Sequence, residues 1–241
     1  MKEFIRAAQE NLSFLLICLA VFAALVLVAL AAERLLGMKR RSLGAARTVS
    51  FVAMFSAVAA VLMFLEIPLF FAPSFYKIDL SELPVLICTF YLGPVSGVVC
   101  ELLKVLLKLL FKGTTTAFVG DFANFAVGCS FVLPASIVYH AHKTRKGAVA
   151  ALCLGTAVMT VFGSLFNAWF LIPKFAELYG APMEAIIGMG SAVNASIHDL
   201  STLVLFAVVP FNLLKGVIVS ALTFLLYKRV ERLIFRKSAN S

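Results

Sequence analysis

Charged residues are scarce in this chain of 241 residues. Only 14% of the residues are charged and 62% are hydrophobic, whereas soluble domains average about 25% charged and about 45–50% apolar residues. No polar stretch is long enough to form a sizeable soluble domain. The composition therefore excludes a soluble globular protein and predicts an integral membrane protein.

Motifs that carry chemistry are missing as well. There is no Gly-x-x-x-x-Gly-Lys-Ser/Thr phosphate loop, so the chain does not power transport by itself, and there is no His-Glu-x-x-His metal motif. The five cysteines all lie within apolar segments and lack metal-ligand spacing. Buried thiols of this kind act as small hydrophobic side chains. We therefore expect no metal, no cofactor and no catalytic activity.

Basic residues outnumber acidic ones, 21 to 12, which gives a formal net charge of +9. Thirteen of the 21 form three clusters, at positions 34, 39, 40, 41 and 47; 143, 145 and 146; and 228, 229, 232, 236 and 237. These clusters lie at the ends of apolar segments, where the positive-inside rule places cytoplasmic loops. The charge therefore predicts orientation in a bilayer and no nucleic-acid partner.

Seven apolar segments follow one another, at residues 11–33, 48–65, 82–92, 96–111, 118–139, 148–172 and 202–229. The third is short and stops at the helix-breaking pair Gly93–Pro94. We predict an all-α membrane protein with a six-helix transmembrane bundle at residues 48–230. An additional N-terminal transmembrane helix with a basic linker precedes it at residues 1–47, and a basic cytoplasmic tail follows at residues 231–241.

An even number of crossings separates the three basic clusters, so all of them can lie in the cytoplasm together with both ends of the six-helix core. Residues 66–81, 112–119 and 173–201 then face outward, and the extra helix places Met1 outside. We expect residues 173–201 to form an outer loop with one short interfacial helix.

Asn212 and Lys215 lie in the middle of the last apolar segment. A lysine near the centre of a membrane helix costs about 2.5–3.5 kcal/mol on insertion scales, and residues three apart share one helical face. The two side chains are therefore expected to point together into a binding cavity. An ammonium and an amide suit a carbonyl-rich or anionic organic ligand better than an ion.

Other polar residues lie at the predicted membrane edge. The loop after the second segment carries four aromatic residues with Lys77 and Asp79, and we expect it to close over a planar ligand. Asp121 suits a helix start electrostatically, so capping alone explains it, whereas Asn124 lies one turn deeper. Asn167 suits helix–helix hydrogen bonding as well as ligand contact.

Two further patterns have alternative explanations. Pairing of Glu101 with Lys104, and extension of Lys108 toward water, explains the charged stripe of the fourth segment without a ligand; contact with a ligand or partner is the alternative. Ala53 and Ala57 have the small-xxx-small spacing that lets helices approach closely. That face serves either internal packing or another subunit.

Five ordered motifs carry a resemblance: FLEIPL at 64–69, KIDLSELP at 77–84, GPVSG at 93–97, GDFANF at 120–125 and PFNLLKG at 210–216. From about Thr48 to Arg229 the chain resembles the substrate-binding S components of energy-coupling factor (ECF) transporters, most closely the riboflavin-specific branch. The segment before Thr48 departs from the six-helix pattern of that family.

The resemblance implies a six-helix bundle that binds riboflavin from outside as the transported ligand. It also implies partnership with a transmembrane coupling subunit and two cytoplasmic ATPases in the cell membrane. The family's alanine motif corresponds to Ala53 and Ala57, the docking face for the coupling subunit. Its Asn-x-x-Lys motif corresponds to Asn212 and Lys215, which hold the isoalloxazine ring.

Weaker correspondences concern Asn124 and the loop with Lys77 and Asp79, and Asp121 stands where the family has glutamate. Three alternatives stay open: an S component for another vitamin or precursor, an intramembrane enzyme that uses the stripe of Lys104 and Lys108, and a structural membrane subunit without a ligand.

Overall fold

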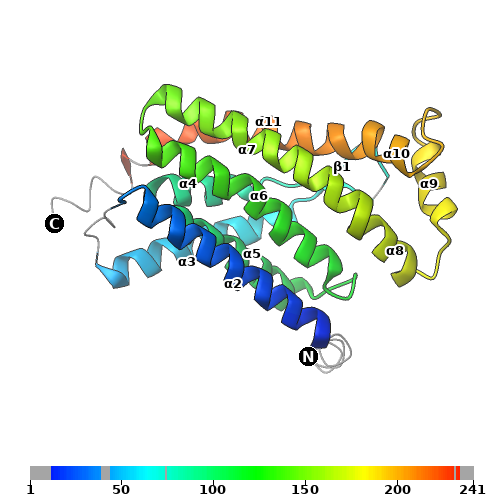
Figure 1. The fold of residues 1–241 in the computed structure, drawn as a ribbon, viewed down its shortest axis with the longest axis horizontal. Coiled ribbons are helices and arrows are strands. Elements are labelled where there is room, and N and C mark those ends of the chain that lie inside the picture. Colours follow the sequence, from blue (N-terminus) through cyan, green and yellow to red (C-terminus); the bar gives the residue numbers. More distant parts are fainter. Residues whose placement is uncertain (1–11, 39–43, 74, 231, 234–241) are drawn as a thin grey trace.

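The computed structural model describes residues 12–38, 44–73, 75–230 and 232–233, and the fold is an elongated bundle of helices (Figure 1). The main helices are α2 (Leu12–Leu35), α3 (Ala45–Phe64), α4 (Glu82–Leu92), α5 (Pro94–Lys112), α6 (Val119–Ala141), α7 (Arg145–Phe166) and α11 (Val209–Val230). They correspond to the seven apolar segments of the sequence. The prediction of a six-helix bundle with one extra N-terminal helix is confirmed.

Shorter elements complete the chain. A two-residue antiparallel pair, β1 (Ile67–Pro68) and β2 (Lys77–Ile78), closes the loop between α3 and α4. The π-helical turn η1 (Asn167–Leu171) and α8 (Ile172–Leu178) extend α7. After α9 (Met183–Ser191), α10 (Leu200–Leu203) and the second π-helical turn η2 (Val204–Val208) lead into α11.

The expected outer loop at 173–201 is partly wrong, because the helix continues through Pro173 to Leu178. Proline lacks an N–H group and normally breaks a helix interior. Here it follows η1 and occupies a first-turn position of α8, where a missing donor costs little. A widened turn before each proline, η1 before Pro173 and η2 before Pro210, keeps both long helices continuous.

The start of α3, the α6–α7 connection and the end of α11 lie at the same end of the bundle, at the left of Figure 1. The described members of the basic clusters lie at or beside these termini. The remaining cluster members, Lys39, Arg40, Arg41, Arg236 and Lys237, lie outside the described residues, as does most of the predicted tail at 231–241. Helices α8, α9 and α10 occupy the opposite end.

Five of the described helical runs are long and apolar enough to cross a membrane: Leu12–Leu35, Ala45–Phe64, Val119–Ala141, Arg145–Leu178 and Leu200–Val230. Helix α4 is apolar but has only 11 residues. Helix α5 has 19 residues and four charged side chains. Helix α4 buries Val85, Leu86 and Cys88 completely, and α5 buries two of its four charged residues, Glu101 and Lys104.

The turn between α4 and α5 consists of a single residue, Gly93. Gly93 has φ of 112°, a conformation that residues with a Cβ atom rarely adopt. Pro94 then opens α5 with its φ already suited to a helix. This geometry reverses the chain at once, so α4 and α5 lie against each other.

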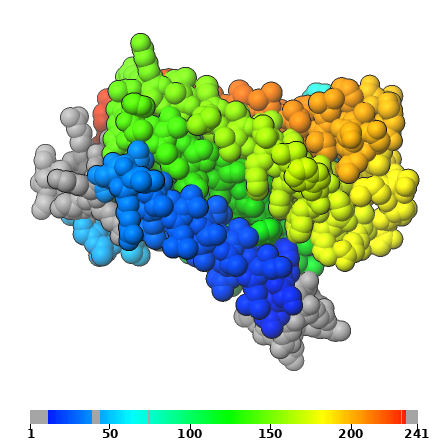
Figure 2. Space-filling model, viewed as in Figure 1, coloured from blue at the N-terminus to red at the C-terminus, as the bar shows by residue number. Residues whose placement is uncertain are grey.

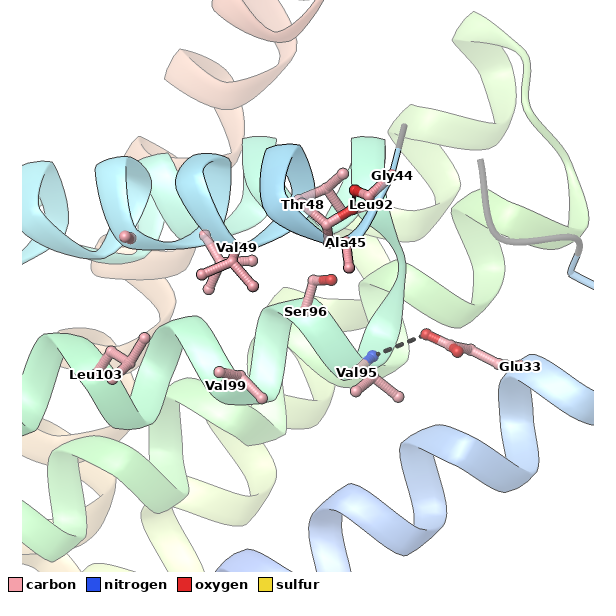
Figure 3. A pocket seen from close by; sticks show the side chains of 12 residues that line it. Glu33, Gly44, Ala45, Thr48, Val49, Leu92, Val95, Ser96, Val99 and Leu103 are labelled. Carbon is pink, nitrogen blue, oxygen red and sulfur yellow. Dashed lines mark hydrogen bonds between the residues drawn. The ribbon is translucent and has the colours of Figure 1, made fainter. Parts of the chain in front are cut away.

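The extra helix α2 lies across one face of the bundle, against α5 and α6 (Figures 1 and 2). Only Ala29 of this helix is buried, and Phe22, Leu25 and Val26 pack against the bundle. Its exposed apolar side chains, such as Leu16, Leu19 and Leu27, suit contact with lipid. Near its end, Glu33 accepts a hydrogen bond from the Val95 N–H at 3.1 Å (Figure 3). Because the first N–H groups of a helix lack internal partners, Glu33 caps α5 from another helix.

Candidate ligand-binding site

A cavity of about 480 Å³ lies at the end of the bundle that carries α8 and the 65–81 loop. Its walls come from that loop, the starts of α4 and α6, the end of α5, the α7–η1–α8 run and α11. All seven polar residues that the sequence predicts for a ligand site line it: Lys77, Asp79, Asp121, Asn124, Asn167, Asn212 and Lys215. The geometry therefore brings together residues that span 139 positions of the chain.

Lys215 forms the floor of this cavity. Its amine lies 3.1 Å from Asp79 Oδ2 and 3.0 Å from Glu82 Oε2. The sequence predicted a polar partner for this buried amine and assigned that role to a ligand. In the structure the amine donates a hydrogen bond to Asp79 Oδ2 and forms an ion pair with Glu82 Oε2. Its nearest partners are therefore carboxylates of the protein, and the three donors of an ammonium leave at least one for the cavity.

Asn212 lies one turn before Lys215 and is 2% exposed. Its Nδ2 donates to the Val208 carbonyl at 3.0 Å, in the widened turn η2. A Cβ atom added at Gly163 of α7 would lie 3.1 Å from both terminal atoms of this amide. The glycine thus permits α7 and α11 to hold the Asn212 amide between them, at the cavity wall.

Asn167 begins the other widened turn, η1. Its Nδ2 donates to the Gly163 carbonyl at 2.7 Å, and its Oδ1 accepts from the Tyr76 hydroxyl at 2.7 Å. Its side-chain partner therefore lies in the 65–81 loop and not in another long helix. Because Asn167 also lines the cavity, its contact with a ligand stays a prediction. The bond fixes the Tyr76 ring beside Phe211, with 5.2 Å between ring centroids.

The sequence suggested that Lys108 extends toward water, but in the structure it points into the protein. Its amine lies 2.5 Å from Asp121 Oδ1 and 3.1 Å from the Gly113 carbonyl. Asp121 therefore joins α6 to α5 and does more than start a helix. One turn deeper, the buried Oδ1 of Asn124 has no hydrogen-bond partner among the described residues, which leaves it available to a ligand.

The rim of the cavity carries a second charged group. Glu66 accepts from Lys77 at 3.0 Å and lies 3.3 Å from the Lys112 amine. Burial raises the pKa of Glu66, but the two lysines outweigh it and hold the pKa below its ordinary 4.5. Lys77 and Asp79, which the sequence grouped together, therefore act at different depths, one at the rim and one at the floor.

The loop between α5 and α6 completes the rim in a strained conformation. Ala117 and Phe118 have φ of 45° and 70°, values that are uncommon outside glycine. The Thr114 hydroxyl accepts from the Phe118 N–H at 2.9 Å, and Thr116 accepts from the Gly120 N–H at 3.0 Å. These side chains satisfy N–H groups at the start of α6, and the loop places Thr115 and Thr116 against the cavity.

Ala53 and Ala57 lie outside the cavity, on an exposed face of α3. Their neighbours Ser56 and Ala60 turn inward and are buried, and Ser56 donates to Cys100 Sγ of α5 at 3.2 Å. Beside Ala53, a groove of about 560 Å³ runs between α3 and α5 toward Glu33 (Figure 3). The small-residue face is therefore a surface and not an internal contact.

Sequence reasoning missed Glu82 and Glu66. Glu82 was indistinguishable from an ordinary acidic residue in the first turn of a helix. Tyr76 was included only as one of the four loop aromatics expected to close over a planar ligand, without its bond to Asn167. The finished cavity combines aromatic walls with amide, carboxylate and ammonium groups at its floor. Among the described residues no group of three or more His, Cys, Asp or Glu suits a metal ion.

Comparisons with known proteins give the same architecture. The ECF transporter substrate-specific component family matches residues 47–227. The riboflavin transporter RibU of Staphylococcus aureus (strain TCH60) is 34% identical over 185 residues, 77% of this chain and 90% of that protein. The riboflavin transporter FmnP of Bacillus subtilis (strain 168) is 31% identical over 181 residues, 75% and 90% of the two chains.

A solved structure described as the S component of a bacterial ECF transporter is 32% identical, with a TM-score of 0.63. The alignment covers 80% of this chain and all of that one. The family match begins after α2, so the extra helix precedes the shared region. This chain is a substrate-specific component of the ECF transporter family.

Proposed function

We propose that this chain captures riboflavin from outside the cell and delivers it inward as the substrate-binding subunit of an ECF-type importer. The observation that carries the proposal is the cavity, because it gathers all seven predicted polar residues in a chain whose relatives are riboflavin transporters. The subunit binds and does not catalyse; ATP hydrolysis belongs to its partners.

The cavity suits the two halves of riboflavin. Its volume of about 480 Å³ lies in the range of small-molecule sites, about 300–1,000 Å³. Phe75, Tyr76 and Phe211 offer faces to a planar isoalloxazine ring, since aromatic rings favour offset stacking. At the floor, Asn212 and Lys215 present donors to the ring carbonyls, and the hydroxylated ribityl chain suits the polar rim.

The exposed face with Ala53 and Ala57 is proposed to receive the coupling subunit. Small side chains let helices approach closely in a membrane, and the groove beside Ala53 gives this face a concave edge. Through the coupling subunit, two cytoplasmic ATPases drive transport.

We further propose that the core at 48–230 has both ends in the cytoplasm and its cavity open to the outside. The basic clusters near those ends support this orientation through the positive-inside rule. Under the same assignment, residues 1–47 add a helix and linker to the binding unit, and residues 231–241 form a cytoplasmic tail.

Purification in detergent tests the proposal directly. The protein should retain flavin from the cells and show the visible flavin absorption bands. In a titration, the fluorescence of added riboflavin should be quenched in a saturable way. Thiamine and biotin in excess should leave the titration unchanged. A protein that arrives without flavin and binds none would overturn the riboflavin assignment, and tight binding of another vitamin would replace it.

A further inference from the structure

A chain of alternating charges continues from the cavity floor into the bundle. Asp79 and Lys215 face the cavity, Glu82 follows, and Lys104 and Glu101 lie behind it. The Glu82 carboxylate bridges the two lysines: Oε2 lies 3.0 Å from Lys215 and Oε1 lies 3.2 Å from Lys104. Glu101 Oε2 lies 2.7 Å from the Lys104 amine and ends the chain.

The two inner members have no access to the ligand. Lys104 and Glu101 are completely buried and do not line the cavity. A charge in this position is costly unless it is paired, so the pairing of Lys104 with two carboxylates needs a reason. The geometry offers one, because Lys104 is the second of only two cationic partners of Glu82 among the described residues.

Packing holds the inner end rigidly. A Cβ atom added at Gly128 of α6 would lie 2.6 Å from Glu101 Oε2, so the carboxylate rests directly on the α6 backbone. Lys104 is therefore held by its own helix and by Glu101, and it holds one oxygen of Glu82. The other oxygen of Glu82 then points at the Lys215 amine.

We propose that Lys104 and Glu101 are positioning residues of the ligand site, which act through Glu82 to fix the Lys215 amine toward the cavity. This inference rests on the proposed function, since riboflavin reports the position of Lys215. Without Lys104, Glu82 is free to turn both oxygens to Lys215. The ammonium donor that faces the cavity is then drawn away from the ligand.

A double-mutant cycle in the purified full-length chain tests the proposal. We expect Lys104→Met to raise the riboflavin Kd about tenfold or more, because truncating one partner of a buried charge pair is strongly felt. In a Lys215→Met background the same change should add less than about twofold, because its effect passes through the amine already removed. Asn212 lies outside the charge chain. When Lys104→Met is combined with Asn212→Ala, the fold-change in Kd of the double variant should therefore equal the product of the two single fold-changes within about twofold.

A purely structural role gives a different pattern. Loss of packing would lower the thermal midpoint, and Lys104→Met would then raise the riboflavin Kd by the same factor in the Lys215→Met and Asn212→Ala backgrounds. That result would overturn the proposal. A Kd for Lys104→Met that equals the wild-type value would overturn it as well. If Lys104→Met does not fold, Glu101→Gln serves instead, because it keeps the shape of the side chain and weakens the hold on Lys104. Its effect on the riboflavin Kd should also be largely lost in the Lys215→Met background and should multiply with that of Asn212→Ala. Failure of the wild-type protein to bind riboflavin would instead refute the proposed function.

Discussion

Replacement of Lys215 by methionine is the most direct perturbation of the cavity floor, because it keeps the apolar stem and removes only the ammonium. The ammonium donates a hydrogen bond to Asp79 and forms an ion pair with Glu82, so at least one of its three donors remains for a ligand. A hydrogen bond from a charged group contributes about 1.5–3 kcal/mol. At about 1.4 kcal/mol per tenfold, the riboflavin Kd should rise about 10- to 150-fold.

The same substitution should also destabilise the protein. Removal of one partner from a buried ion pair costs about 3–5 kcal/mol. In the variant, Glu82 keeps its ion pair with Lys104, and Asp79 still accepts from the Ser81 N–H at 2.8 Å. We therefore expect the free energy of unfolding to fall by about 3 kcal/mol, the lower end of that range. Thermal unfolding in detergent, followed with and without riboflavin, separates this loss from the loss of affinity.

Lys174→Met is the matched control. Lys174 pairs with Glu177 at 2.7 Å, but both side chains are substantially exposed and neither lines the cavity. Exposed pairs contribute about 0–1 kcal/mol, so both affinity and stability should stay near wild type. Wild-type affinity in a well-folded Lys215→Met protein would refute the assignment of this lysine to the ligand site.

Four further substitutions probe the other parts of the molecule. Ala57→Leu should spare riboflavin binding in detergent but abolish uptake by cells, since the larger side chain obstructs the docking face; preserved uptake would count against that face. Gly163→Ala should weaken binding several-fold, by roughly 1 kcal/mol of lost hydrogen bonding, because the new methyl group meets the Asn212 amide at 3.1 Å; Gly188→Ala, where a Cβ atom would meet nothing within 4 Å, is the control away from the cavity. Because the pKa of Glu66 is lowered in the folded protein, its ion pairs with Lys77 and Lys112 are intact above pH 4.5, its ordinary pKa. They are lost only as the pH falls through the lower, folded-state pKa. Stopped-flow release of riboflavin should therefore be equal at pH 7 and at mildly acidic pH, and faster for Glu66→Gln at both; a pH-dependent wild type would refute this reasoning. Glu33→Ala should lower stability by about 0.5–2 kcal/mol, the usual range for a lost helix cap, without a change in affinity; unchanged unfolding would show that the cap is dispensable.

Much of the fold was predictable because its signals are local. Runs of apolar residues defined the helices, and the pair Gly93–Pro94 marked the turn between two of them. The high cost of a membrane lysine, together with the i,i+3 spacing to Asn212, identified the floor of the site. These inferences need only short stretches of chain and a known penalty.

The partners of those residues were not predictable in the same way. Asp79 is separated from Lys215 by 136 positions, and no periodicity relates them. Glu82 resembled a helix-start residue because its second role depends on which helix packs behind α4. Pro173 was expected to end a helix, and a widened turn that the sequence does not announce lets the helix continue.

The length of α4 has a consequence for the path of the vitamin. Eleven residues at 1.5 Å each span only about 16 Å, roughly half of a hydrocarbon layer of about 30 Å. In the orientation proposed above, its first residue, Glu82, lies near mid-depth, and its last turn lies at the basic, cytoplasmic end of the bundle. In that orientation a molecule resting on the cavity floor has travelled about halfway across the bilayer before any ATP is hydrolysed.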